Sequence, residues 1–132
     1  MTQHGFDATT SSSFFFEEEH RMLRAQVRRF VEEEIKPHAT KWEEDGATPR
    51  DLLRKMGALG LFGITYPERF GGSDMDERAT VVLAEELGRS TYAGVAITAL
   101  VHTDMASVHI FNAGNEAQKQ KYLPRVISGE II

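Results

Sequence analysis

The chain of 132 residues contains no cysteine, which excludes disulfides and thiolate chemistry. Positive charge is also scarce: 15 lysines and arginines stand against 20 acidic residues, so the formal net charge is −5 at pH 7. No basic stripe offsets this balance, and binding of nucleic acid is therefore not expected. Long apolar runs are few as well. The longest begins at Ala93 and is interrupted at His102–Asp104, so the sequence predicts no membrane span.

Targeting signals are not recognisable near the N-terminus. There is no basic segment, and Phe14–Phe16 is too short for the apolar part of a signal peptide. A cytoplasmic location is therefore expected. Residues 1–15 are mostly small and polar and are predicted to form a disordered tail. The remainder, residues 16–132, is long enough for one domain with a buried core.

Helical periodicity dominates the chain after this tail. Apolar residues recur every three or four positions, for example at Leu23, Val27 and Phe30, which is typical of a helix with one buried face. The sequence contains no internal repeat and no convincing strand before its last residues. It therefore predicts an all-α bundle of about five to six helices.

Capping signals predict where several of these helices begin and end. Thr48 and Asp74 are expected to start two helices, because each is followed three residues later by an acidic residue. Asn115 and Gln118 have the same spacing at the start of the last helix, which Pro124 is expected to bend or split. Helix stops are predicted at three glycines: Gly60, Gly88 and Gly114.

The helix predicted from about Thr91 to Phe111 differs from the others. Its apolar residues occupy every face, which is typical of a helix that is buried on all sides. The amphipathic helices around it offer little apolar surface for such complete burial. We therefore expect part of this helix to pack against something outside the chain.

Two patterns invite a functional interpretation, but a simpler one is favoured for each. His102 and His109 lie seven residues apart, yet no third ligand follows at a useful spacing, so no metal site is predicted. Gly71–Ser73 is interpreted as a turn rather than as a phosphate-binding loop, because Asp74 at the following helix start would repel an anion.

A third pattern is the adjacent pair Glu85 and Glu86, which suggests an acid and a base. Successive residues of a helix do not face each other, however. We expect instead an ion pair with Arg89. Glu86 also lies on the apolar side of its helix, so it is expected to be half-buried with a hydrogen-bond partner.

Four segments carry a combined signal: RRFVEEEIKPHATKWEEDG, MGALGLFGITYPERFGGSDMD, LAEELGRS and AGNEAQKQKYLPRVISGE. In this order and spacing they resemble the N-terminal all-helical domain of the acyl-CoA dehydrogenase family, over about residues 16–132. The resemblance implies that a middle β-domain and a C-terminal helical bundle complete the enzyme. Ile131 and Ile132 would then begin the first strand of the β-domain.

The resemblance also implies an activity. In the family, an acyl-CoA thioester lies between the flavin of FAD and a glutamate base in a dry pocket. The base removes the α-proton and the flavin accepts the β-hydride, which gives the trans-2-enoyl-CoA. The glutamate and the FAD-binding segment belong to the two later parts of the fold, so no catalytic and no cofactor-binding residue is expected in this chain. Alone it is expected to be inactive and not to retain FAD. An electron-transfer flavoprotein as acceptor and a homo-oligomer are implied in the same way.

Five residues match the family's acyl-chain-lining positions: Ile97, Thr98, Val101, His102 and Met105. The four-residue spacing of Ile97, Val101 and Met105 predicts one stripe along the helix, and such side chains suit an aliphatic tail. The alternative is that all five are ordinary core residues. His102 suits an apolar lining poorly. It is expected to mark the mouth of the pocket, or to hydrogen-bond Asp104 or another domain.

Other functions remain open at this point. Acyl-CoA oxidases and flavin-dependent monooxygenases share the scaffold, and the residues that distinguish them lie beyond residue 132. A different alternative is a non-catalytic helical module that binds a partner protein.

Overall fold

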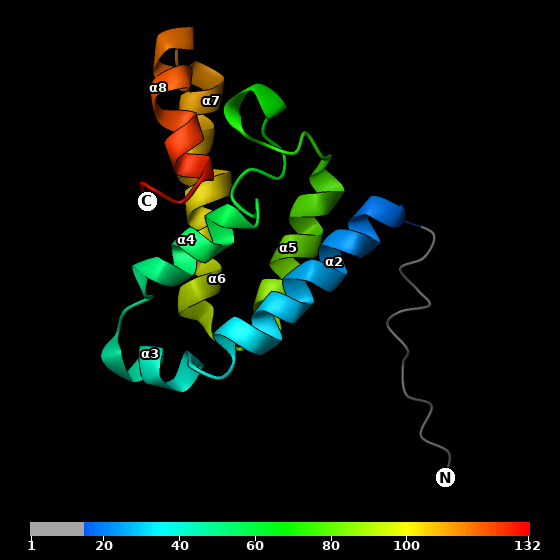
Figure 1. Ribbon diagram of the computed structural model, residues 1–132, viewed down its shortest axis with the longest axis vertical. Coiled ribbons are helices and arrows are strands. Elements are labelled where there is room, and N and C mark those ends of the chain that lie inside the picture. Colours follow the sequence, from blue (N-terminus) through cyan, green and yellow to red (C-terminus); the bar gives the residue numbers. More distant parts are fainter. Residues whose placement is uncertain (1–14) are drawn as a thin grey trace.

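The computed structural model describes residues 15–132. All regular elements in this range are helical, which confirms the all-α prediction. Apart from Phe15, the predicted tail lies outside the described residues. Figure 1 shows α2 and α5 on one side of the domain, α7 and α8 on the other, and α4 and α6 between them. The elements are α2 (Glu18–Phe30), η1 (Val31–Ile35), α3 (Ala39–Asp45), α4 (Arg50–Ala58), η2 (Glu68–Phe70), α5 (Glu77–Gly88), α6 (Ala93–Leu100), η3 (Val101–Ala106), α7 (Ser107–Ala113) and α8 (Glu116–Ile127).

Helices α2 and α5 lie side by side and bury their apolar faces against each other (Figure 1). Leu23 and Val27 on α2 are buried, as are Val82 and Leu83 on α5. Because the apolar residues of each helix recur every three or four positions, each helix presents a single apolar stripe to its neighbour. This pair forms the centre of the main hydrophobic core.

A polar contact joins the N-terminal ends of the same two helices. The buried ring of His20 accepts the backbone N–H of Glu17 at Nδ1 (3.1 Å) and donates from Nε2 to the carboxylate of Asp76 (2.8 Å). Asp76 in turn caps α5 by accepting the backbone N–H of Arg78. Hydrogen bonds from Arg78 and from His20 hold the pKa of Asp76 well below its usual range. The caps of α2 and α5 therefore depend on each other.

Two predicted helix starts are wrong, by two residues at α5 and by one residue at α4. Asp76, and not Asp74, is the N-cap of α5. Asp74 has a left-handed conformation (φ 51°) and donates its backbone N–H to the carbonyl of Tyr66. Helix α4 begins at Arg50 without a side-chain cap, so Thr48 has no capping role. In the case of Asp74, the cause is a tertiary contact that keeps this residue in the loop.

A second hydrophobic cluster packs the loop before α5 against α7 and α8. Its buried members are Tyr66, Phe70, Leu123 and Ile127. The predicted start of α8 is confirmed, since Asn115 and Gln118 form a reciprocal capping box. Pro124 does not split α8, which continues through it to Ile127. Leu123 and Ile127 are buried on either side of the proline, and this packing outweighs the lost backbone hydrogen bond.

The glycines occupy several kinds of helix position. Gly60 follows α4 in a left-handed conformation (φ 77°), and Gly114 follows α7, as predicted. Gly88 is instead the last residue of α5 itself. Gly57 lies inside α4, where an added Cβ would come 2.2 Å from the carbonyl oxygen of Ser128. Helix α4 therefore meets the end of α8 at a point that has room only for a hydrogen atom.

We predict opposite effects of alanine at Gly57 and Gly88. Gly57→Ala is expected to lower the free energy of unfolding by about 3 kcal/mol, because backbone must shift to admit the methyl group. Gly88 has no atom within 4 Å of an added Cβ, so Gly88→Ala is expected to raise it by up to about 1 kcal/mol. Urea unfolding followed by circular dichroism measures both. Equal effects of the two substitutions would contradict the close contact between α4 and α8.

A buried carboxylate also links α5 to α2. The side chain of Glu86 is 1% exposed and accepts hydrogen bonds from Arg24 (3.0 Å) and Arg28 (2.8 and 2.9 Å). Arg89 lies 3.4 Å away. The expected ion pair with Arg89 and the expected hydrogen-bonded partner are confirmed, although Glu86 is more deeply buried than predicted. Burial raises the pKa of Glu86, but the hydrogen bonds from Arg28 and Arg24 outweigh it and hold this pKa below its ordinary value of 4.5.

Glu86→Gln is expected to lower the free energy of unfolding at pH 7 by about 2 kcal/mol, since three charged hydrogen bonds are weakened and the arginines are partly exposed. The neighbouring Glu85→Gln serves as the control. Glu85 is half-exposed and, among residues 15–132, its recorded ion pair is with Arg24, so the loss of its charge is expected to cost less than about 1 kcal/mol. Chemical unfolding of the three proteins measures the difference. If the two substitutions lowered the free energy of unfolding equally, the burial of Glu86 would add nothing to the strength of its ion pairs with Arg24 and Arg28.

The difference in free energy of unfolding between the parent chain and Glu86→Gln is expected to depend on pH. Because the pKa of Glu86 is lowered in the folded state, its contribution is fully present above the ordinary pKa of 4.5 and is lost as the pH falls through the lower folded pKa. Unfolding curves at pH 7, 5 and 3 measure this. A difference that is as large at pH 3 as at pH 7 would contradict the lowered pKa.

Candidate functional site

The helix predicted near Thr91–Phe111 is present as one continuous rod, Ala93–Ala113, made of α6, η3 and α7. By length and hydropathy alone it would suffice to cross a membrane: its most apolar window has a mean hydropathy of 1.3. Core helices of soluble proteins satisfy the same criterion, so the prediction of no membrane span stays a prediction. Only 28% of that window is buried. Much of this apolar surface is therefore uncovered.

The described part of the chain covers only one side of this helix. The buried residues are Val95, Ala99, His102, Thr103 and Ser107. They face the main core and the end of α8. The prediction that the helix is buried on all sides is thus wrong within this chain. The expectation of an uncovered apolar surface on it is confirmed.

The uncovered side carries three large apolar side chains, which we call the exposed stripe. It consists of Ile97 (61% exposed), Val101 (37%) and Met105 (61%). Residues four apart in an α-helix drift by about 40° per step. The middle of this helix is η3, where the backbone N–H of Ser107 donates to the carbonyl of His102, five residues earlier. This wider turn reduces the drift, so the three side chains share one face, as predicted.

Two of the five predicted lining residues do not belong to the exposed stripe. Thr98 is half-buried beside it, and its hydroxyl donates to the carbonyl of Gly94 (2.7 Å). His102 is 7% exposed. Its Nε2 lies 3.0 Å from the carbonyl oxygen of Val126, and its ring packs edge-on against Phe62.

The predicted lining role of His102 is therefore a wrong prediction, as is its predicted hydrogen bond to Asp104. The ring points into the domain, where it joins this helix to the end of α8. The sequence alone did not reveal this role, because the hydrogen-bond partner of His102 is the carbonyl of Val126, which lies 24 residues further along the chain.

One polar residue beside the exposed stripe was not singled out from the sequence. The carboxylate of Asp104 follows Thr103, whose hydroxyl donates to it (3.0 Å). Burial raises the pKa of Asp104 despite this hydrogen bond. Asp104 is exposed at the edge of the apolar face, so anything that covers this face has to provide a polar partner for its carboxylate or leave it in water.

The loop Gly71–Ser73 is a turn, as predicted. Its three backbone N–H groups donate within the chain, to the carbonyls of Glu68, Pro67 and Gly63. An added Cβ at Gly72 would come 1.9 Å from the carbonyl oxygen of Tyr66. The backbone is therefore packed closely and has no donor left for a phosphate.

The described residues contain no group of three or more histidine, aspartate or glutamate side chains that could hold a metal ion. The two histidines weighed above do not face the same way. His102 is buried and His109 is exposed. The buried side-chain polar atoms of residues 15–132 all have a hydrogen-bond partner.

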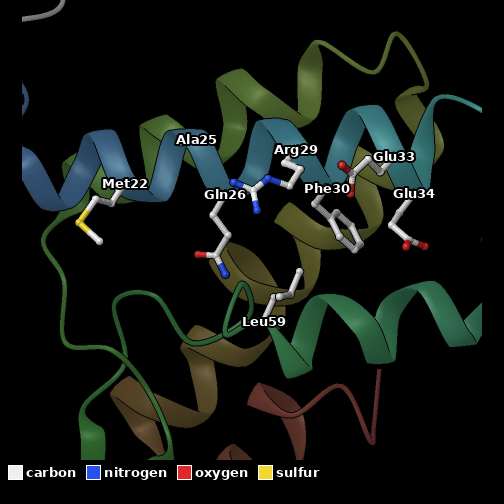
Figure 2. A pocket seen from close by; sticks show the side chains of 8 residues that line it. All are labelled: Met22, Ala25, Gln26, Arg29, Phe30, Glu33, Glu34 and Leu59. Carbon is white, nitrogen blue, oxygen red and sulfur yellow. The ribbon is translucent and has the colours of Figure 1, made fainter.

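A groove of about 510 Å³ lies between α2, η1 and the end of α4. Figure 2 shows Gln26 and Phe30 pointing from the first helix toward Leu59. Arg29 and Glu33 stand at its rim. The lining mixes charged and apolar groups and lacks an arrangement of acid, base and nucleophile.

Comparison with known proteins gives a consistent result. The family model described as "Acyl-CoA dehydrogenase, N-terminal domain" matches residues 17–130. The chain is 38% identical over 117 residues to the (2S)-methylsuccinyl-CoA dehydrogenase of Cereibacter sphaeroides, which covers 88% of this chain and 21% of that protein. The chain spans 21% to 30% of the length of the curated relatives it matches.

Solved structures agree in fold. A glutaryl-CoA dehydrogenase from Mycobacterium smegmatis superimposes with a TM-score of 0.86 at 31% identity, over 96% of this chain and 32% of that one. An acyl-CoA dehydrogenase complexed with FAD, from Bacillus anthracis, gives a TM-score of 0.81 at 35% identity, over 89% of this chain and 20% of that one. From the family match and these likenesses it follows that the chain belongs to the acyl-CoA dehydrogenase family, of which it forms the N-terminal helical domain.

Proposed function

We propose that this chain acts as the N-terminal domain of an FAD-dependent acyl-CoA dehydrogenase. The reaction is the α,β-dehydrogenation of an acyl-CoA thioester to the trans-2-enoyl-CoA. The family match supports the reaction class. The similar proteins named above are dehydrogenases of CoA thioesters, which supports the same substrate class.

The exposed stripe is the observation that carries the proposal for this chain. An isoleucine, a valine and a methionine stand in one line on the uncovered side of a helix whose other side is packed. We propose that Ile97, Val101 and Met105 form one wall of the acyl-chain pocket, with Thr98 at its edge. Each methylene of the acyl chain that leaves water against such a wall contributes about 0.8 kcal/mol. Methionine adapts to chains of different shape.

His102 has a supporting role in this proposal. Its hydrogen bond to the carbonyl of Val126 fixes the back of the helix against α8, and the wall is thereby held in place from behind. The residue does not touch the acyl chain.

FAD supplies the hydride acceptor when it is bound, and we place its site outside the described residues. The backbone N–H groups of Gly71–Ser73 are already used, and the basic side chains Arg24 and Arg28 are paired with Glu86. We therefore assign three features to the rest of a longer protein: the flavin site, the glutamate base and the contacts with an electron-transfer flavoprotein. We propose that this longer protein is cytoplasmic and homo-oligomeric. This chain contributes the wall and excludes water from it.

The chain purified alone is expected not to retain FAD and not to oxidise an acyl-CoA. The longer protein that contains it is expected to be yellow, with one flavin per subunit, and to be bleached by an acyl-CoA under anaerobic conditions. Absorbance at the flavin maximum measures both. Release of hydrogen peroxide in air would identify an oxidase instead. Stoichiometric flavin in the isolated chain, or a colourless longer protein, would contradict the proposal.

The exposed stripe is expected to make the isolated chain self-associate and bind a hydrophobic dye. The double substitution Ile97→Lys/Met105→Lys is expected to weaken self-association at least about tenfold, while the free energy of unfolding changes by less than about 0.5 kcal/mol because both side chains are exposed. Sedimentation velocity and dye fluorescence are the measurements. Val81→Lys is the control, since Val81 is a 50% exposed apolar residue on α5 outside the stripe. A parent chain that stays monomeric and binds no dye would refute this prediction.

A further inference from the structure

The wide turn η3 beneath the exposed stripe is held by hydroxyl groups. In such a turn the backbone bonds span five residues, and carbonyl oxygens are left without their usual partners. The hydroxyl of Ser107 lies 2.7 Å from the carbonyl oxygen of His102 and 3.1 Å from that of Thr103. The hydroxyl of Thr103 lies 3.1 Å from the carbonyl oxygen of Ala99. These two side chains belong to the helix itself.

A third hydroxyl comes from outside the helix. The Oη of Tyr66 lies 2.6 Å from Ser107 Oγ and 3.2 Å from the carbonyl oxygen of Thr103. Ser107 has one hydroxyl hydrogen, which it donates to a backbone carbonyl, so Tyr66 is the donor in the short contact with Ser107. Burial raises the pKa of Tyr66, and its hydroxyl therefore stays protonated at neutral pH.

The loop before α5 holds Tyr66 firmly in this position. Its side chain is 4% exposed and packs edge-on against Phe111, with ring centroids 5.4 Å apart. Its carbonyl accepts the backbone N–H of Asp74 (3.0 Å), and Gly72 approaches that carbonyl more closely than any other residue type would permit. A rigid loop therefore presents one hydroxyl to the turn.

We propose that Tyr66 is a positioning residue that determines substrate specificity, because its hydroxyl, through Ser107, holds η3 in the conformation that keeps Val101 and Met105 on the acyl-facing wall. This inference rests on the function proposed above. If η3 relaxed to an ordinary α-helical turn, the full drift of about 40° over four positions would return between Val101 and Met105. Met105 would then lie further from the line of Ile97 and Val101 than it does now.

The first test uses hydrogen exchange in the isolated chain, which needs neither flavin nor substrate. Tyr66→Phe removes the hydroxyl and keeps the ring that packs on Phe111. The backbone N–H of Ser107, which donates to His102, is expected to exchange roughly two- to tenfold faster. Tyr122→Phe is the control, because Tyr122 lies on α8 and its described contact is with Lys121. Unchanged exchange at Ser107 in Tyr66→Phe would overturn the proposal.

The second test measures specificity in the longer flavoprotein. Values of kcat/KM are compared over a series of straight acyl-CoA thioesters from four to sixteen carbons. Tyr66→Phe is expected to change the ratio between the longest and shortest substrates at least about threefold, with the flavin content unchanged. General destabilisation of the protein would lower kcat/KM by the same factor for all of the substrates. Ser107→Ala is expected to change the ratio in the same direction, and the double variant no further, because both remove one bridge.

The outcomes separate this inference from the proposed function. A flavoprotein that dehydrogenates acyl-CoA thioesters, with the same chain-length ratio in Tyr66→Phe and Tyr122→Phe, would overturn the role of Tyr66 and leave the proposed function intact. A protein that dehydrogenates none of the thioesters would overturn both.

Discussion

Apolar residues occupy every face of helix Ala93–Ala113, yet the described part of the domain packs against only one of its sides. The packed side fixes the helix through Val95 and Ala99 in the core and through His102 against α8. The opposite side exposes the stripe to water, which is unfavourable by about 25 cal/mol for each Å² of apolar surface. That uncompensated surface explains why the domain suits a position beside an apolar ligand or another domain.

Polar contacts in the interior decide how accurately this helix is placed. The main core relies on the paired caps of α2 and α5 and on the Glu86 cluster, which join elements that are far apart in the sequence. The second cluster relies on Tyr66 and Ser107. A buried donor or acceptor that loses its partner is penalised by about 1–3 kcal/mol, so each of these contacts excludes alternative packings that apolar side chains alone would tolerate.

Local patterns predicted much of the fold and part of the site. The capping box of Asn115 and Gln118 and the stop at Gly114 were predictable, because both depend on residues within one helical turn. The line of Ile97, Val101 and Met105 followed from their spacing. Predictions failed where a distant residue intervened. The loop contact with Tyr66 moved the cap from Asp74 to Asp76, and buried neighbours carried α8 through Pro124.

The sequence by itself determined the helices, several of their ends and the apolar character of the long helix, because periodicity and capping are local properties of the chain. Only the tertiary structure decided which side of that helix is covered, which way His102 points, and which side chains meet Glu86 and Ser107. Those contacts join residues 24 to 62 positions apart. Their geometry follows from how the helices pack, which no short stretch of sequence specifies.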